Sequence, residues 1–248
     1  MTAATTSAAF NGRVIELMQR LGDAQAATQA MELFQEILVH LGVESGIFMS
    51  RLRDDASRSS YRSLFLCDPI WAAEYAQSDW HIHDPWLRHA STQTEPIRSS
   101  ELILASEEEK TFIARSAAHG FASALIAPAP TCVGLSRVGV LCVGSKEEGF
   151  FNDERSRLLR VVARALAMEL HRWLHRTLKE DLLDRSRLSE DELELLRHEA
   201  AAHSSKVIGA VLNIEAKTVD CRFQRLNAKL NAPDRRTAVR IAKLYGLI

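Results

Sequence analysis

The sequence predicts an α+β fold, in which an N-terminal α-β-α sandwich with an antiparallel sheet precedes an all-α helix-turn-helix domain of four helices. Two observations predict the division. Strand-like and helix-like segments alternate only in the first 145 or so of the 248 residues, and basic residues gather near the end. We place the first domain at 1–178, a linker at 179–187 and the second domain at 188–248. Apolar residues make up 46% of the chain, an ordinary value for a globular protein, and a chain of this length can bury a sizeable core.

The first domain begins with two helices and two strands. Apolar residues recur with helical period over 10–22 and 26–42, and both segments end in Leu-Gly, a helix-stop signal. Residues 45–52 and 61–67 are typical of strands, and polar residues 54–60 between them predict a turn. Asp68-Pro69 and Asp84-Pro85 each predict a helix start, with Asp as the cap and Pro at the first helical position.

The sequence of the rest of the first domain predicts a helix, a β-hairpin and a long helix. Residues 106–119 start with a Ser cap and an acidic turn, and Gly120 stops the helix. Strands are expected at 121–127 and 136–144, joined by a loop at 128–135. The helix expected over about 152–179 is apolar on more than one stripe, which favours packing against its own sheet and against a partner, so we expect a homodimer.

The sequence of the second domain predicts four helices, at 189–202, 204–212, 215–230 and 235–245. Only Asn213-Ile214 separates the second from the third, a turn tight enough for a helix-turn-helix. From Ser204 onward nine Lys/Arg stand against three acids, a net charge of +6, whereas the whole chain carries −1. This polarity favours a polyanion such as double-stranded DNA as partner. The alternative is a solvated basic face with no partner.

Several function classes lack their sequence signals. The N-terminus has no cationic start and no apolar core of a signal peptide, and no apolar run approaches the ~18 residues of a membrane span. The four cysteines are scattered, which favours free thiols in the cytoplasm over a metal site or disulfides. No nucleophile-base pair, paired carboxylates or phosphate loop indicates an enzyme. We therefore expect no catalytic residues, no cofactor and no metal.

The last 61 residues resemble the LuxR-type DNA-binding domain. The resemblance implies that the third helix reads DNA, through Lys217, Thr218, Asp220, Cys221, Gln224, Arg225 and Lys229. The chain departs from the pattern at Ala202 (glycine in the family), Val207 and Arg222. The matching positions are Leu188, Ser189, Glu192, Glu194, Leu196, Ala200, Ile208, Leu212, Ile214, Thr218, Val219, Leu226, Lys229, Leu230, Arg235, Ala238, Val239, Ala242, Gly246, Leu247 and Ile248.

A crowded aromatic stretch at 71–86 extends the resemblance to quorum-sensing receptors that bind acyl-homoserine lactones. Trp71, Tyr75 four residues later and Asp84-Pro85 thirteen residues after the Trp have that family's spacing. The resemblance also points to Cys67, Ser99 and Cys142, where such receptors often have Tyr, Trp and Ser or Thr. Phosphoreceiver and P-loop ATPase regulators share the DNA-binding tail but need motifs that this chain lacks.

The implied ligand fits these side chains chemically. Asp84 would accept the lactone's amide N–H, the donor-only indole of Trp71 would suit the ring carbonyl, and Tyr75 would line the pocket or bind the amide carbonyl. The alternative for the stretch is an ordinary aromatic core with Asp84 only a helix cap. A second alternative keeps DNA binding but replaces the lactone with another small amphiphile, or with no ligand.

Overall fold

The computed structural model describes residues 8–53, 59–131, 137–153 and 155–248. It divides into two compact units. The first comprises Met1–Arg51 and Tyr61–Trp173, and the second Leu52–Ser60 and Leu174–Ile248. Among the described helices, none combines enough length with enough apolar character to cross a lipid bilayer. Residues 54–58 of the turn expected at 54–60 and residues 132–135 of the loop expected at 128–135 lie outside the described residues, as does the start of the chain.

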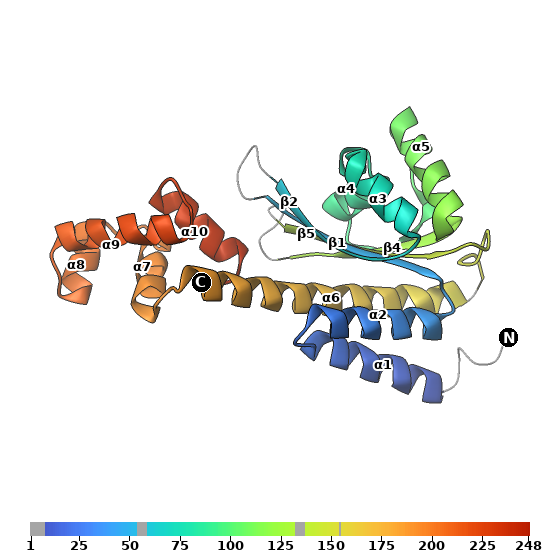
Figure 1. The fold of residues 1–248 in the computed structure, drawn as a ribbon, viewed down its shortest axis with the longest axis horizontal. Helices are drawn as coiled ribbons and strands as arrows, with labels where there is room; N and C mark the ends of the chain where they lie inside the picture. The colour runs from blue at the N-terminus through green and yellow to red at the C-terminus, as the bar shows by residue number, and fades with distance from the viewer. Residues whose placement is uncertain (1–7, 54–58, 132–136, 154) are drawn as a thin grey trace. The chain divides into compact units, whose positions relative to one another are not determined.

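A five-stranded sheet forms the centre of the first unit (Figure 1). Its order is β2-β1-β5-β4-β3, and Ile97 of β3 pairs antiparallel with Ile126 of β4, as Ser123 of β4 does with Ser145 of β5. Every residue of β4 and β5 is buried, so both faces of this hairpin are covered. The strands are β1 (Ser45–Arg53), β2 (Ser59–Leu66), β3 (Ile97–Arg98), β4 (Ser123–Ala129) and β5 (Arg137–Ser145).

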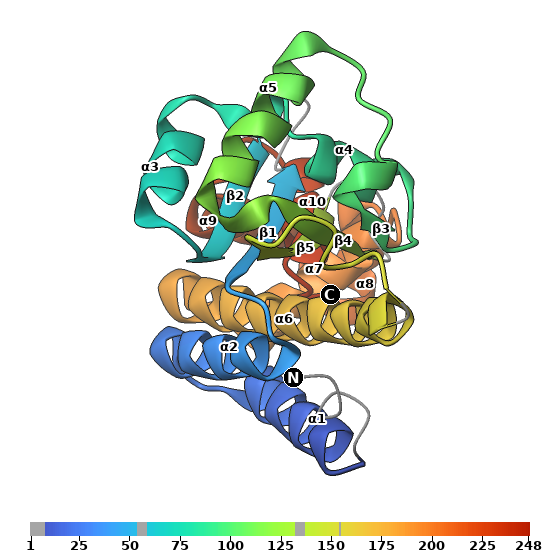
Figure 2. The same ribbon diagram turned by 90° about the vertical axis from the view of Figure 1, so that its right-hand side faces the viewer.

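Helices cover both faces of this sheet, which confirms the predicted sandwich. Figure 2 shows α6 and α2 in successive layers on one side, with α1 outermost, and α3, α4 and α5 on the other. Trp173 of α6 donates its indole N–H to the carbonyl of Ala24 at 3.1 Å, tying α6 to the turn after α1. The helices are α1 (Ala8–Asp23), α2 (Ala27–Leu41), α3 (Pro69–Gln77), α4 (Pro85–Thr92), α5 (Glu107–Ser116) and α6 (Arg155–Ser186).

The helix starts of this unit follow the predicted capping chemistry. The Asp68 carboxylate accepts from the backbone N–H of Ile70 at 2.9 Å at the start of α3, and Ser106 accepts from Glu109 at the start of α5. The end of α5 differs from prediction. The α-helix ends at Ser116 and a π-helical turn, η4 (Ala117–Phe121), follows, in which Gly120 has a left-handed φ of 100°. Short 3₁₀ turns, η2 (Trp80–Ile82) and η3 (Ser99–Glu101), complete the unit.

The predicted end of the long helix near 179 is wrong. Helix α6 runs to Ser186, so nearly all of the expected linker is helical, and Arg187 ends it with a φ of 47°. The polar composition of 179–187 concealed Leu182 and Leu183, which pack against the hydrophobic core of the second unit. Burial of these leucines stabilises the additional turns.

The second unit is a four-helix domain built on α7 (Glu190–Ala200), α8 (Ser205–Leu212), α9 (Ala216–Lys229) and α10 (Arg235–Leu244). Ser189 and Glu192 form the predicted capping box of α7. Asn213 takes a left-handed φ of 53° between α8 and α9. Gly209 allows the close turn, since a Cβ there would lie 2.6 Å from the carbonyl oxygen of Ile214. Val219, Phe223 and Leu226 of α9 are buried in this core.

Ala202, which stands where the LuxR-type pattern has glycine, gives a test of this unit. Its φ is 60°, a region that costs an L-residue roughly 1–2 kcal/mol. Glycine removes this strain but adds freedom to the unfolded chain, so we expect Ala202→Gly to raise the free energy of unfolding of the second unit by a net ~1 kcal/mol. Urea denaturation followed by circular dichroism measures the change.

The matched control is Ala210→Gly at an exposed position inside α8. The same substitution should there lower the free energy of unfolding by ~1 kcal/mol, because the backbone is helical. Equal destabilisation by both variants would contradict the strain at Ala202.

Candidate functional site

Helix α3 carries Trp71 and Tyr75 on one face, where both become part of the core of the first unit. Their spacing of four residues puts them on the same side of the helix. Trp71 is 0% exposed and Tyr75 is 6% exposed. Their rings meet edge to face, with centroids 6.1 Å apart. The two residues that the sequence analysis paired therefore lie side by side, pointing inward.

Asp84 joins this pair through a buried carboxylate with two tasks. Its Oδ1 accepts from the backbone N–H groups of Trp86 at 2.8 Å and Leu87 at 3.1 Å, which caps α4. Its Oδ2 accepts the Tyr75 hydroxyl at 2.7 Å. Burial raises the pKa of Asp84 to about 6, although these three hydrogen bonds favour the charged form. Burial, with the Asp84 charge nearby, also raises the pKa of Tyr75, so its phenol keeps its proton.

Phe112 of α5 is the centre of the aromatic cluster around this site. It is fully buried, and four rings surround it: Trp86 with centroids 4.9 Å away, Trp71 at 5.4 Å, Trp80 at 5.6 Å and Tyr75 at 6.2 Å. All four contacts are edge to face, the arrangement that the charge distribution of aromatic rings favours. Phe112 is not among the residues predicted from the sequence, since it lies far along the chain from the 71–86 stretch.

A histidine lies flat against Trp71. The centroids of the His119 and Trp71 rings are 5.9 Å apart, and the angle between the ring planes is 17°. His119 Nδ1 lies 2.7 Å from Oδ2 of Asp68, the cap of α3. The hydrogen bond to His119 is the largest of the effects that lower the pKa of Asp68. The cap of α3 thus also positions the ring that covers Trp71.

Three buried indole nitrogens of the cluster, those of Trp71, Trp80 and Trp86, have no acceptor within hydrogen-bonding distance among the described residues. The Trp80 indole interacts with the carboxylate of Glu74 and helps to lower its pKa, which leaves Trp71 and Trp86 without an acceptor. The indole N–H is a donor with no accepting capacity. Leaving such a donor unsatisfied in a protein interior costs roughly 1–3 kcal/mol. The cluster thus combines a buried acceptor, Asp84, with two buried donors.

The remaining three predicted residues lie around the same core. Cys67 and Cys142 both pack in the cluster that contains Trp71. Burial raises the pKa of Cys67 to about 12 and raises that of Cys142 as well, so both are neutral thiols. The Cys67 thiol donates to the carbonyl of Asp68 at 3.7 Å. Ser99 contacts this core through β4, because its hydroxyl accepts from the backbone N–H of Ala124, a residue of the same cluster, at 3.1 Å.

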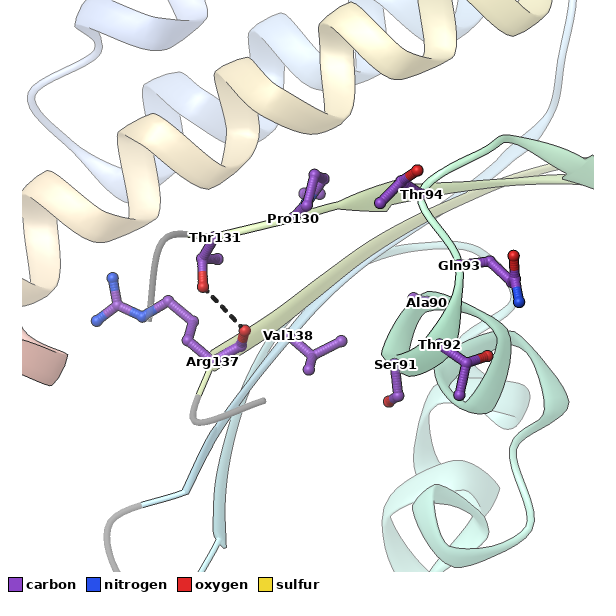
Figure 3. Close-up of a pocket in the computed structure, with 10 residues that line it drawn as sticks. Ala90, Ser91, Thr92, Gln93, Thr94, Pro130, Thr131, Arg137 and Val138 are labelled. Carbon is purple, nitrogen blue, oxygen red and sulfur yellow. Dashed lines mark hydrogen bonds between the residues drawn. The ribbon is translucent and has the colours of Figure 1, made fainter. Parts of the chain in front are cut away.

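A cavity of about 210 Å³ opens beside this core (Figure 3). It lies between the end of α4 and the adjoining ends of β4 and β5, where the Thr131 hydroxyl donates to the carbonyl of Arg137 at 3.1 Å. Two of its lining residues, Ala90 and Val138, also contact the aromatic core cluster. The cavity therefore adjoins the apolar surroundings of Trp71 and Asp84.

The predicted DNA-facing residues are on the exposed side of α9. Phe223 is 1% exposed and fills a core position, whereas the neighbouring Arg222 is half-buried. The predicted outward residues are all exposed: Lys217, Thr218, Asp220, Cys221, Gln224, Arg225 and Lys229.

Two of these seven side chains are engaged inside the unit. Asp220 accepts from the Ser205 hydroxyl and from Arg235, both at 2.6 Å, which lowers the pKa of its carboxyl. The ammonium of Lys229 bonds to Glu192 at 2.7 Å and to the carbonyl of Arg187 at 3.0 Å. These contacts hold α9 to neighbouring helices, a role that helical periodicity does not reveal.

Comparison with known proteins assigns both units to families. Residues 26–174 match the family described as autoinducer binding domain, and residues 186–242 match the luxR family of bacterial regulatory proteins. The transcriptional activator protein PhzR of Pseudomonas fluorescens is 27% identical over an alignment of 186 residues that covers 72% of this chain and 72% of PhzR.

Solved structures share the fold. SdiA of Escherichia coli has a TM-score of 0.76 at 18% identity, covering 96% of this chain and 99% of its own. SdiA in complex with octanoyl-rac-glycerol gives 0.69 at 17% identity and 98% of either chain. CepR2 of Burkholderia cenocepacia, described as N-acylhomoserine lactone dependent, gives 0.57 at 19% identity, covering 67% of this chain and 96% of its own. Because the autoinducer-binding family alone spans more than half of the sequence, the chain belongs to the LuxR-type quorum-sensing transcription regulators, with an autoinducer-binding domain followed by a luxR-family DNA-binding domain.

Proposed function

We propose that the first unit binds an acyl-homoserine lactone and that this ligand controls promoter binding by the second. The observation that carries the proposal is the pairing of the buried Asp84 carboxylate with the unpartnered indole N–H of Trp71, inside one apolar cluster. A lactone head group offers the complementary pair, an amide N–H and a ring carbonyl. We assign the ligand domain to 1–178 and the DNA-binding domain to 188–248, joined by 179–187.

The acyl chain of such a ligand needs an apolar lining next to its polar head. The cluster supplies Ile47, Ile126 and Val140, all nearly fully buried. Each methylene that leaves water contributes about 0.8 kcal/mol. Affinity for the class of amphiphile therefore comes mainly from the tail, and selectivity for the head comes from Asp84 and Trp71.

Another small amphiphile is the second candidate for the same site. SdiA, which shares the fold, has a solved structure in complex with octanoyl-rac-glycerol, an apolar chain on a head that has no amide N–H. Cys67, Ser99 and Cys142 stand where lactone receptors often carry stronger donors or an indole, which also favours a wider ligand range. Mass spectrometry of material extracted from the purified protein distinguishes the two ligand classes.

DNA binding is assigned to the exposed face of α9, with the recognition residues of the family pattern. Lys217, Gln224 and Arg225 are exposed there, and Lys, Arg and Gln side chains suit phosphates and base edges of the major groove. We place this activity in the cytoplasm, because the DNA to be bound is there. Regulation of transcription, without catalysis, agrees with buried thiols that are held neutral and so are poor nucleophiles.

A homodimer is proposed through the outer face of α6 in the first unit. Val161 is 64% exposed and Met168 39% exposed, and exposed Ala165 lies between them on the same side of the helix. A continuous apolar stripe on a surface helix suits a second copy of itself. Sedimentation velocity should give a dimer that Met168→Glu converts to a monomer, and a monomeric parent would contradict the proposal.

Arg225→Ala should weaken operator binding and leave stability nearly unchanged. Its side chain is exposed on α9, and surface substitutions usually change stability by within ~0.5 kcal/mol. Loss of one phosphate or base contact should lower affinity about tenfold. A salt titration of binding to operator DNA, with melting curves, measures both effects.

Lys229→Ala is the contrasting control, because its ammonium bonds to Glu192 and to the carbonyl of Arg187. It should lower the free energy of unfolding of the second unit by about 1 kcal/mol. If Arg225→Ala bound its operator as tightly as the parent at every salt concentration, α9 would not dock through this face.

Asp84→Asn should reduce lactone affinity about ten- to hundredfold with little loss of stability. Asn caps helices as well as Asp does, so its oxygen can keep the bonds to Trp86 and Leu87. Its NH₂ then replaces Oδ2 and faces the ligand N–H, and an unsatisfied buried donor costs ~1–3 kcal/mol. Trp71→Phe removes one neutral donor and should cost tenfold at most. Isothermal titration calorimetry measures both variants.

The pH dependence of the parent is the control for this assignment. With a pKa raised to about 6, Asp84 is charged at neutral pH and protonated below, so lactone affinity should fall as the pH falls through 6. Between about pH 4 and 6 the folded state holds a proton that the unfolded state has lost. Asp84 therefore makes the ligand-free protein less stable as the pH rises through this window. Asp84→Asn should flatten both profiles. An undiminished ligand response in Asp84→Asn would overturn the lactone site.

A further inference from the structure

Trp86 is anchored to Asp84 but has no assigned task. It is the second residue after Asp84, and its backbone N–H donates to Asp84 Oδ1 at 2.8 Å. Its side chain is 2% exposed. The indole packs against Phe112 at 4.9 Å and against Phe121 at 5.2 Å between centroids. These contacts fix the ring within the aromatic cluster.

The indole N–H of Trp86 is left unsatisfied in that position. Nε1 is buried and finds no acceptor among the described residues. Trp173 of the same unit is equally buried, but its indole N–H has an acceptor, the carbonyl of Ala24 at 3.1 Å. Packing alone does not require a Trp at position 86, since Phe would fill much of the space without burying a donor.

Trp71 shares this property and contacts the same ring, whereas the third such indole, Trp80, interacts with the Glu74 carboxylate. Trp71 and Trp86 both meet Phe112 edge to face, at 5.4 and 4.9 Å between centroids. Asp84 is linked to both. Its carboxylate accepts the hydroxyl of Tyr75, which packs against Trp71, and it accepts the backbone N–H of Trp86. One acceptor and two donors are thus collected in one dry cluster.

These three groups match the three polar groups of an acyl-homoserine lactone one to one. The lactone has one N–H and two carbonyls, and under the proposed function Asp84 takes the N–H and Trp71 the ring carbonyl. The Tyr75 hydroxyl is committed to Asp84, and the Cys67 thiol to the carbonyl of Asp68, so neither is left for the amide carbonyl. Cys142 is a thiol, and thiols are weak donors.

We propose that Trp86 is a ligand-binding, specificity-determining residue whose indole N–H donates to the amide carbonyl of the ligand. The inference rests on the proposed lactone site. It restricts the ligand to amphiphiles with an acceptor oxygen on the acyl side of the N–H that Asp84 binds. Trp86 also supplies the donor for the amide carbonyl that the cysteines at 67 and 142 do not provide.

The test compares two probes, N-octanoyl-homoserine lactone and its thioamide, in which sulfur replaces the amide oxygen. Sulfur is a poorer acceptor, so the parent should bind the thioamide several-fold more weakly. Trp86→Phe should bind the octanoyl lactone between twofold and about tenfold more weakly than the parent does. It should also lose the preference for oxygen over sulfur. Trp80→Phe, which removes an indole that packs on Phe112 and interacts with Glu74, should keep that preference.

A second measurement covers a Trp86→Phe variant that fails to fold. In the ¹⁵N-labelled parent, the indole N–H signals are assigned from Trp71→Phe, Trp80→Phe and Trp173→Phe, which leaves that of Trp86. Octanoyl lactone should shift the Trp86 signal downfield, as a new hydrogen bond requires, and the thioamide should shift it less.

The outcomes separate the two proposals. If the octanoyl lactone binds but the Trp86 signal stays in place, or Trp86→Phe keeps the preference for oxygen, the role of Trp86 is overturned and the lactone site stands. If the parent binds neither probe, the lactone site falls, and the Trp86 assignment with it.

Discussion

The buried carboxylate of Asp84 is the interaction on which the ligand-binding unit depends. A charge with little access to water is costly, and three hydrogen bonds from Tyr75, Trp86 and Leu87 offset that cost. The same bonds start α4, fix the phenol on α3 and orient the Trp86 backbone. Structure and recognition are therefore coupled at one side chain, and the incomplete compensation is visible in its raised pKa.

Local chemistry made much of the fold predictable. Asp-Pro pairs, Ser caps and Leu-Gly ends act within a few residues, so helix starts at Pro69, Pro85 and Glu190 follow directly from sequence. Prediction failed where tertiary packing decides. The two residues of β3 carry no period, and Leu182 and Leu183 extend α6 through a stretch that is polar in composition.

The candidate site was predictable only in the part that one stretch of sequence contains. Trp71, Tyr75 and Asp84 share a recognisable spacing, whereas Phe112 and His119 arrive from another helix through packing. The unsatisfied N–H of Trp86 could not be foreseen either, because satisfaction depends on every neighbouring acceptor. On α9, exposure follows from helical period, but the partners of Asp220 and Lys229 come from other helices.

Those two ion pairs bear on how salt would affect the DNA complex. Binding of cations to DNA releases condensed counterions, and the logarithm of affinity falls with the logarithm of salt in proportion to the phosphates neutralised. Of the nine basic residues after Ser204, Lys229 and Arg235 already neutralise Glu192 and Asp220. Because these two side chains already pair with carboxylates, they release few counterions when the domain docks on DNA. The affinity should therefore depend less on salt than the number of basic residues suggests. A larger share of its affinity must then come from contacts that salt leaves untouched.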